Sequence, residues 1–154
     1  MAARPASVMT GGCQCGAVRY ALYTAPTHAS ICHCRMCQKA SGNYFQPFTG
    51  VPRAEFTWTK GTPGTFRSSE LVERDFCRDC GTPLTYRALD RDRVSVTIGS
   101  LDEPGRIALE MQYGVESAVL DLGAAAQLTT ITTEASMPAE RLAQVATRQH
   151  PDHD

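Results

Sequence analysis

The stretch Cys32-His33-Cys34-Arg35-Met36-Cys37 decides how this chain is interpreted, because it places three thiols within six residues. Two cysteine pairs flank it, Cys13-Gln14-Cys15 upstream and Cys77-Arg78-Asp79-Cys80 downstream. All seven cysteines of the chain therefore fall into three tight groups. In a reducing compartment, clustered thiols bind zinc or carry out redox chemistry more often than they form disulfides. The grouping predicts metal sites around which the fold is built.

The remaining composition is that of an ordinary globular domain. The 154 residues fit one domain, with 42% apolar and 20% charged residues, as is typical of soluble proteins. No apolar run approaches the roughly 20 residues of a membrane span. The formal net charge of -1 creates no broad positive field, so we expect neither a nucleic-acid nor a membrane partner. Residues 1–10 lack the apolar centre of a secretory signal, which predicts a disordered lead-in and a cytoplasmic protein.

Alternating apolar residues predict short strands along most of the chain. Residues 17–23 and 94–98 place apolar side chains at every second position, which is the period of a strand. Turn signals separate such segments about every eight to twelve residues, and Gly50 to Pro52 is interpreted as one of these turns. A weaker strand is expected over residues 107–113. The pattern predicts a mainly β, antiparallel, zinc-binding domain over residues 11–135.

The C-terminal residues follow a different pattern. Beyond Pro138, the apolar residues Leu142, Val145 and Ala146 recur at helical spacing, and proline is favoured in the first turn of a helix. We therefore expect a short amphipathic helix within residues 137–148 and a frayed tail from Gln149. Residues 136–154 are accordingly predicted to form a C-terminal helix and tail outside the β domain.

Counting the cysteines as metal ligands divides them into four and three. A tight Cys-x-x-Cys turn presents both sulfurs to one ion, and zinc takes four such ligands tetrahedrally. One set would be saturated and structural: Cys13, Cys15, Cys77 and Cys80. The other set has three members, which leaves a zinc position open for water or substrate as in catalytic sites: Cys32, Cys34 and Cys37. We therefore predict two zinc ions per chain, one structural and one catalytic.

Other assignments of these residues stay open at this point. The pairs Cys34/Cys37 and Cys77/Cys80 can form a single zinc-ribbon site, with the other three cysteines as bystanders. Cys34/Cys37 can also act as a redox dithiol, although the βαβ context of such motifs is missing. His33 is a possible fourth ligand, but alternation along an extended segment points it away from its cysteine neighbours and favours a packed or surface position.

Three blocks of this sequence resemble the glutathione-dependent formaldehyde-activating family, which also includes centromere protein V. The blocks are Gly12-Cys13-Gln14-Cys15-Gly16-Ala17-Val18-Arg19-Tyr20, Cys32-His33-Cys34-Arg35-Met36-Cys37-Gln38-Lys39-Ala40-Ser41-Gly42 and Phe76-Cys77-Arg78-Asp79-Cys80-Gly81-Thr82-Pro83-Leu84. All three occur in order, and the likeness extends over residues 11–101 or so. The segment 115–120 departs from the family, many members of which carry a tryptophan there, and this leaves the substrate open.

The resemblance implies a β-tent fold of the Mss-four-like type, built of antiparallel sheets and holding two zinc ions. It implies structural ligands at Cys13, Cys15, Cys77 and Cys80 and catalytic ligands at Cys32, Cys34 and Cys37. It also implies a carbon-sulfur lyase that forms S-hydroxymethylglutathione from formaldehyde and glutathione. The family is broad, and a zinc site of this kind can also serve other thiols or aldehydes.

The open three-cysteine site suggests a mechanism and leaves a rival. Zinc lowers the pKa of an incoming thiol, so that the substrate sulfur is a thiolate at neutral pH and can attack an aldehyde carbon. Arg35 and Lys39 are candidate partners for substrate carboxylates, or else solvated surface charges. Tyr44 and Phe45 are candidate pocket residues, or else core residues. The rival from another class is a non-catalytic, zinc-stabilised binding module for a protein or nucleic-acid partner.

Overall fold

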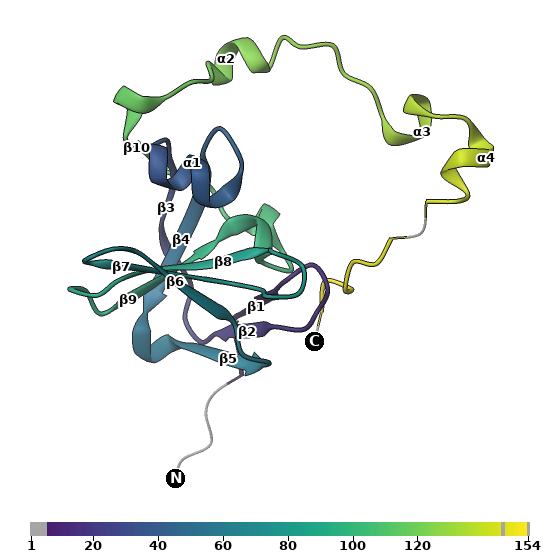
Figure 1. The fold of residues 1–154 in the computed structure, drawn as a ribbon. Coiled ribbons are helices and arrows are strands. Elements are labelled where there is room, and N and C mark those ends of the chain that lie inside the picture. Colours follow the sequence, from purple (N-terminus) through teal and green to yellow (C-terminus); the bar gives the residue numbers. More distant parts are fainter. Residues whose placement is uncertain (1–5, 146, 154) are drawn as a thin grey trace.

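The computed structural model describes residues 6–145 and 147–153, and its strands form two sheets (Figure 1). The smaller sheet has the order β1-β2-β5, with β1 at Met9–Gly12, β2 at Arg19–Leu22 and β5 at Phe56–Lys60. The larger sheet has the order β10-β3-β4-β9-β8-β7-β6. Its strands are β3 (Thr27–Cys32), β4 (Gln46–Pro52), β6 (Gly64–Ser69), β7 (Val72–Phe76), β8 (Pro83–Ala88), β9 (Arg93–Thr97) and β10 (Met111–Tyr113). The predicted mainly β class of the β-tent type is confirmed.

Helices are short and lie between the strands or after them. The helix α1 spans Arg35–Ser41 and ends at Gly42, whose left-handed conformation (φ 63°) closes its last turn as is common for glycine. The single-turn 3-10 helices are η1 (Arg53–Glu55), η2 (Ile98–Ser100), η3 (Pro104–Arg106) and η4 (Val115–Ser117). The remaining α-helices are α2 (Leu122–Ala125), α3 (Thr133–Ser136) and α4 (Ala139–Leu142).

The core lies against the small sheet. All four residues of β2 are buried, so the expected alternation of buried and exposed residues does not hold there, because both faces of the strand are covered. Tyr20 is fully buried, its ring centroid lies 5.4 Å from that of Phe56 and 6.0 Å from that of Trp58, and its hydroxyl is 2.8 Å from Ser100 Oγ. Such aromatic contacts with a satisfied hydroxyl stabilise a core.

Two sequence predictions about strands are wrong in detail. Gly50 to Pro52 is not a turn but the end of β4, where Gly50 pairs with Ser95 of β9. A Cβ at Gly50 would lie 3.0 Å from the Val94 carbonyl oxygen, so the glycine there permits close strand packing. The strand expected over 107–113 is limited to β10, and it pairs in parallel with β3, whereas every other strand pair is antiparallel.

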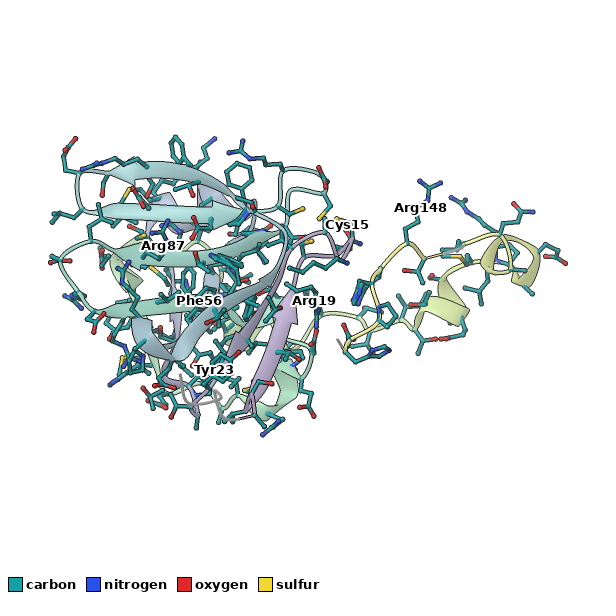
Figure 2. All side chains as sticks on the ribbon, turned by 90° about the horizontal axis from the view of Figure 1, so that it is seen from below. Cys15, Arg19, Tyr23, Phe56, Arg87 and Arg148 are labelled. Atoms are coloured by element: carbon teal, nitrogen blue, oxygen red, sulfur yellow. The ribbon has the colours of Figure 1, made fainter. Side chains whose placement is uncertain are left out.

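The chain after η4 leaves the sheets and returns to them (Figure 1). Arg148 lies on this segment, which stands apart from the sheets in Figure 2. The helix expected within 137–148 is confirmed only as the single turn α4, and Val145 is 59% exposed; Ala146 lies outside the described residues. The tail from Gln149 is not frayed throughout, since the His150 amide donates to the Gln14 carbonyl over 2.7 Å.

The predicted lead-in at residues 1–10 falls partly outside the description, which omits residues 1–5. The strand β1 already begins at Met9, two positions before the expected start of the β domain. The division of the chain at residues 11 and 136 stays a prediction. Within the residues described, none of the helices has the length and apolar character needed to cross a bilayer.

Candidate metal centres

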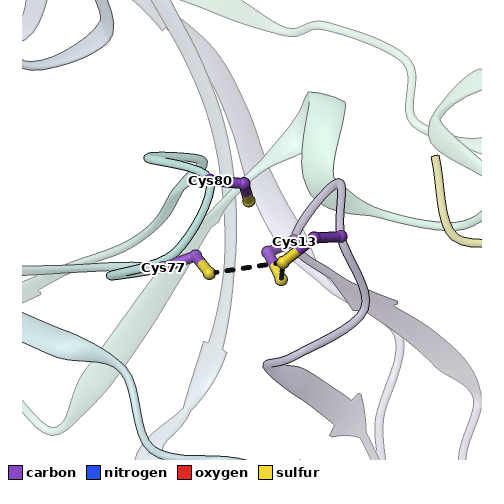
Figure 3. Close-up of side chains that lie close together, drawn as sticks. Cys13, Cys77 and Cys80 are labelled. Carbon is purple, nitrogen blue, oxygen red and sulfur yellow. Dashed lines mark hydrogen bonds between the residues drawn. The ribbon is translucent and has the colours of Figure 1, made fainter. Parts of the chain in front are cut away.

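The first cysteine cluster joins the two sheets. Cys13 and Cys15 lie in the turn between β1 and β2, while Cys77 and Cys80 lie in the turn between β7 and β8. Their four sulfur atoms all lie within 4.8 Å of one another. Cys13 Sγ is 3.5 Å from Cys15 Sγ, which is 3.7 Å from Cys77 Sγ. Figure 3 shows Cys13 facing Cys77 and Cys80 from the other turn. Turns from two different sheets therefore meet at one point.

Glycine and backbone hydrogen bonds shape both turns. The Gly16 amide donates to the Cys13 carbonyl and the Gly81 amide donates to the Cys77 carbonyl, each over 3.0 Å. Both glycines have positive φ, 73° and 77°, which is a conformation that other residues adopt at a cost. The Gln14 amide donates to Thr82 Oγ1 over 3.1 Å and so ties the two turns together. The cluster is thus fixed by its backbone.

The second cluster is local in sequence. Cys32 ends β3, Cys34 precedes the first residue of α1, and Cys37 lies inside α1. Their sulfurs lie within 4.8 Å of one another, and no further His, Cys, Asp or Glu of the described residues joins them. Cys37 is buried, and the other two are half-buried. The predicted division of the cysteines into four and three matches this geometry.

The zinc-ribbon alternative is wrong. Cys77 and Cys80 lie with Cys13 and Cys15, not with the Cys34/Cys37 pair, because the turn after β7 lies next to the turn after β1. His33 is not part of either cluster: it is 1% exposed, its Nε2 lies 2.8 Å from Gln112 Oε1, and its ring packs against Phe45. His33 is therefore the packed histidine that alternation favoured.

Both sulfur sets fit zinc by their chemistry and spacing. Thiolates are soft ligands that suit zinc, and sulfurs bound tetrahedrally at about 2.3 Å lie about 3.8 Å apart. The sulfur separations in both clusters approach that value or exceed it by about 1 Å, and all seven thiols are free of disulfide bonds. The four-sulfur set is complete as a tetrahedron, whereas the three-sulfur set has room for one more ligand.

The segment after β10 encloses the three-cysteine cluster. The His33 amide donates to the Tyr113 carbonyl over 2.8 Å. Gln38 Nε2 donates to the carbonyls of His33 and Ser117, over 2.7 and 2.9 Å. Gly114 lies so close that a Cβ there would be 3.0 Å from the Cys34 amide nitrogen. Gln38 and Gly114 thus hold the cluster, although nothing in the sequence beyond a lone glycine pointed to them.

Arg74 is the cation that contacts the three-cysteine cluster. Its Nη2 donates to Cys37 Sγ over 3.3 Å. A hydrogen bond from Cys32 lowers the pKa of Cys37 to about 5, and the hydrogen bond and charge of Arg74 act in the same direction. The same hydrogen bond raises the pKa of Cys32, because the Cys32 thiol donates its proton to the Cys37 sulfur and would lose that bond on ionising. Arg35 and Lys39, the candidate partners for substrate carboxylates, are both exposed, and Arg35 donates to Gln38; their role toward a substrate stays a prediction.

A signal for Arg74 was present in the sequence. It shares a strand face with Val72 and Phe76 at period two, and an arginine in that position points toward the interior of a half-buried sheet. Its neighbour Asp75 has different partners and accepts hydrogen bonds from Arg87, Thr65 and Thr85. Despite burial, these hydrogen bonds keep the pKa of Asp75 below its ordinary value.

A cleft of about 340 Å³ reaches the three-cysteine cluster through Arg74 rather than through the cysteines, none of which lines it. Arg74 lines it and contacts Cys37, and Gln46 lines it from the position opposite Cys32 in the pairing of β3 with β4. Its other walls are mostly apolar and include Phe48, Phe66 and Phe76. Tyr44 is 56% exposed, and neither it nor Phe45 is among the residues that line the cleft.

Comparisons with known proteins give a family and a fold. An uncharacterised lyase of Schizosaccharomyces pombe is 29% identical over 76 residues, which are 49% of this chain and 55% of the yeast protein, so the chain matches little more than half of that relative. A crystal structure of a Rhodobacter sphaeroides protein aligns with a TM-score of 0.56 at 20% identity, covering 68% of this chain and 99% of that one, and this likeness shows the fold alone. The model of the glutathione-dependent formaldehyde-activating enzyme family matches residues 8–117, and the chain therefore belongs to that family.

Proposed function

We propose that this protein is a zinc-dependent carbon-sulfur lyase that adds glutathione or a similar thiol to formaldehyde or a related small aldehyde. The product with the first pair of substrates is S-hydroxymethylglutathione. Family membership and the lyase name of the yeast relative support this proposal. The observation that carries it is a cluster of three cysteine sulfurs, without a fourth protein donor among the described residues, beside a cleft of about 340 Å³.

The two clusters take different roles in this proposal. Four cysteines would hold a structural zinc between the sheets: Cys13, Cys15, Cys77 and Cys80. Three would hold a catalytic zinc: Cys32, Cys34 and Cys37. When bound there, zinc would supply an open position that lowers the pKa of a thiol ligand. The reaction needs no oxidant, because a sulfur-carbon bond forms, the carbonyl π bond breaks, and the thiol proton is replaced by a proton on oxygen.

Residues of the chain prepare this chemistry in three ways. The three cysteines fix the position of the metal, and burial of Cys37 keeps water from one side of the cluster. The walls of the cleft are mostly apolar and include the buried Phe48, and an apolar wall lowers the local dielectric constant and strengthens electrostatic interactions beside it. Arg74 supplies positive charge beside Cys37, where negative charge from several thiolates accumulates.

The proposal is tested by zinc content together with catalysis of the glutathione-formaldehyde exchange. Zinc per chain is measured by elemental analysis on protein purified without added metal, and the exchange rate is measured by magnetisation-transfer NMR against the uncatalysed rate. We expect two zinc ions and a clear acceleration in the wild type. Cys34→Ser should lose one zinc and the acceleration while circular dichroism stays unchanged. Met36→Ser is the matched control, because Met36 lies in the same turn and is 51% exposed.

Two results would contradict the proposal in different ways. Two bound zinc ions with an exchange rate equal to the background would favour the non-catalytic binding module. Loss of all zinc and of the folded spectrum in Cys34→Ser would mean that the three-cysteine cluster is structural. In either case the enzyme assignment falls.

A further inference from the structure

Arg74 is held between the three-cysteine cluster and the neighbouring strands. Its side chain lies on β7 and is buried, with only 8% of the residue exposed. Nε donates to Ser68 Oγ on β6 over 3.3 Å, and the guanidinium carbon lies 5.0 Å from the centroid of the Tyr86 ring on β8. Nη2 donates to Cys37 Sγ over 3.3 Å. Contacts on both sides therefore fix the guanidinium in one orientation before any ligand binds.

One terminal nitrogen of Arg74 is left for a ligand. Within the described part of the chain, its hydrogen bonds use Nε and Nη2. Among the described residues, His33 Nδ1 is the one fully buried side-chain polar atom without a hydrogen-bond partner. Arg74 Nη1 has no such partner either, but it is not fully buried. Nη1 therefore has accessible surface, and Arg74 is one of the residues that line the cleft.

The other polar side chains among the lining residues are uncharged donors, or acceptors that are already engaged. Thr85 Oγ1 donates to Asp75 and Thr97 Oγ1 donates to the Pro83 carbonyl, over 2.5 and 2.7 Å. Gln46 Nε2 donates one of its two hydrogens to the Pro47 carbonyl over 3.3 Å, and this side chain carries no charge. The Asp75 carboxylate is itself engaged by Arg87. Arg74 is thus the cationic donor in the cleft that has a free N–H next to the cluster.

We propose that Arg74 is the oxyanion-binding residue of this site, which holds Cys37 through Nη2 and receives the aldehyde oxygen through Nη1. This inference rests on the proposed function. As the sulfur-carbon bond forms, an electron pair moves from the carbonyl π bond onto oxygen, which becomes negative. Arg74 donates a hydrogen bond to that oxygen and keeps its own proton, because a guanidinium is not deprotonated in proteins; water supplies the proton of the final hydroxyl group.

Charge explains why an arginine is needed there. Three cysteine thiolates and a substrate thiolate outweigh the charge of one divalent ion by two, and the developing oxyanion adds a further negative charge. A preorganised donor in a cleft with apolar walls stabilises such charge far more than water does. Arg74 meets this condition, since it is fixed by Ser68 and Tyr86 and its two terminal nitrogens serve the cluster and the cleft.

The test compares Arg74→Gln and Arg74→Lys with Arg67→Gln as the matched control. Arg67 lies on the adjacent strand β6, its side chain is 56% exposed, and it contacts Glu70 rather than the cluster. Removing one oxyanion donor typically lowers kcat about 100-fold or more, so we expect that loss in Arg74→Gln with little change in KM for the thiol. Arg74→Lys keeps the charge but not the two-pronged geometry and should recover part of kcat. Arg67→Gln should equal the wild type.

A second readout does not depend on turnover. The affinity of the three-cysteine cluster for zinc is measured by competition with a chromophoric chelator. A hydrogen bond to a charged group is worth about 1.5–3 kcal/mol, which corresponds to about tenfold weaker binding or more in Arg74→Gln. Arg74→Lys should bind zinc nearly as tightly as the wild type. If Arg74→Gln fails to fold by circular dichroism, Arg74→Lys decides the kinetic comparison.

The outcomes separate this inference from the proposed function. A wild type that accelerates the exchange, with Arg74→Gln and Arg67→Gln equally active, overturns the role of Arg74 and leaves the proposed function standing. A wild type without acceleration overturns the proposed function and with it the oxyanion role. In that case, unchanged zinc affinity in Arg74→Gln also shows that the contact with Cys37 contributes nothing to the cluster.

Discussion

Arg19 and Asp102 form a buried ion pair with two hydrogen bonds, at 2.9 and 2.6 Å, and both side chains are less than 10% exposed. Arg19 begins β2, next to the turn that carries Cys13 and Cys15, and Figure 2 shows its position near Cys15. Asp102 also accepts a hydrogen bond from Thr10 on β1. The pair thus joins the small sheet to the chain after η2.

Removing one partner of this ion pair should destabilise the protein strongly. Asp102→Ala removes a carboxylate and two hydrogen bonds from the buried guanidinium of Arg19, and breaking a buried ion pair in this way costs about 3–5 kcal/mol. The free energy of unfolding is measured by urea denaturation of the zinc-loaded protein. Glu103→Ala is the control, because Glu103 is 61% exposed in its pair with Arg106 and should change stability by less than about 1 kcal/mol. Equal effects of the two substitutions would contradict the prediction.

Metal removal should act mainly through the four-cysteine cluster. This cluster links turns of both sheets, and a structural metal contributes its binding free energy to folding. We expect a strong chelator to lower the Tm of the wild type by well over about 10 °C, and Cys80→Ser to have a low Tm with or without chelator. Asp79→Ser is the control, since Asp79 is exposed in the same turn. A Tm unaffected by chelator would refute a structural metal.

Acid should destabilise the protein through Asp75. Hydrogen bonds from Arg87, Thr65 and Thr85 hold its pKa below the ordinary value of 3.8, against the effect of burial. A carboxyl with a lowered pKa in the folded state contributes stability that is full above its unfolded pKa, and this stability is lost as the pH falls through the folded pKa. The free energy of unfolding should therefore fall below about pH 4 in the wild type.

Substitution of Asp75 should remove this pH dependence. Asp75→Asn should cost about 2–3 kcal/mol at pH 7 and flatten the dependence of stability on pH below about pH 4. Urea denaturation across that range is the measurement. Asp92→Asn is the control, because Asp92 is 83% exposed and lies 3.8 Å from Arg53. If both variants keep the wild-type slope, Asp75 is not the group responsible.

Gly114 should be needed to keep Cys34 in place. Its φ is 64°, and a Cβ there would lie 3.0 Å from the Cys34 amide nitrogen and 3.2 Å from Cys34 Cβ. Gly42 has nearly the same φ of 63°, but nothing lies within 4 Å of an added Cβ. Both Gly→Ala variants therefore bear similar backbone strain, of about 1 kcal/mol, while only Gly114→Ala pushes on the cluster.

The comparison of these two glycine variants isolates the effect on the cluster. We expect Gly114→Ala to weaken zinc binding by the three cysteines about tenfold or more, because displacement of one thiol distorts the ligand set. Gly42→Ala should bind zinc as the wild type does. Chelator competition measures both affinities, and equal losses would attribute the effect to backbone strain.

The sequence predicted what depends on local spacing. Cysteine spacing divided the thiols into the same four and three that the structure brings together, since tight turns place nearby sulfurs on one side whatever surrounds them. The β class followed from period-two patterns and regular turn signals. Cysteine spacing alone did not exclude the zinc ribbon, because which turns meet depends on how the two sheets pack.

What the sequence missed depends on contacts between distant strands. Arg74 is 37 positions from Cys37, so local spacing, which drew attention to Arg35 and Lys39, gave no reason to place it at the cluster. The end of β4 at Gly50 resembled a turn because glycine also serves where strands pack closely. The parallel pairing of β10 with β3 could not be predicted, because alternating apolar and polar residues indicate a strand but not which strand it pairs with.

The two clusters differ in how far apart their ligands lie in the sequence. Cys15 and Cys77 are 62 positions apart, whereas the other three ligands lie within six residues. Closing the longer loop costs about 2 kcal/mol more in chain entropy. During synthesis, the ribosome also completes Cys37 before it reaches Cys77. A nascent chain can therefore gather Cys32, Cys34 and Cys37 around a metal before the ligands of the four-cysteine set are all present.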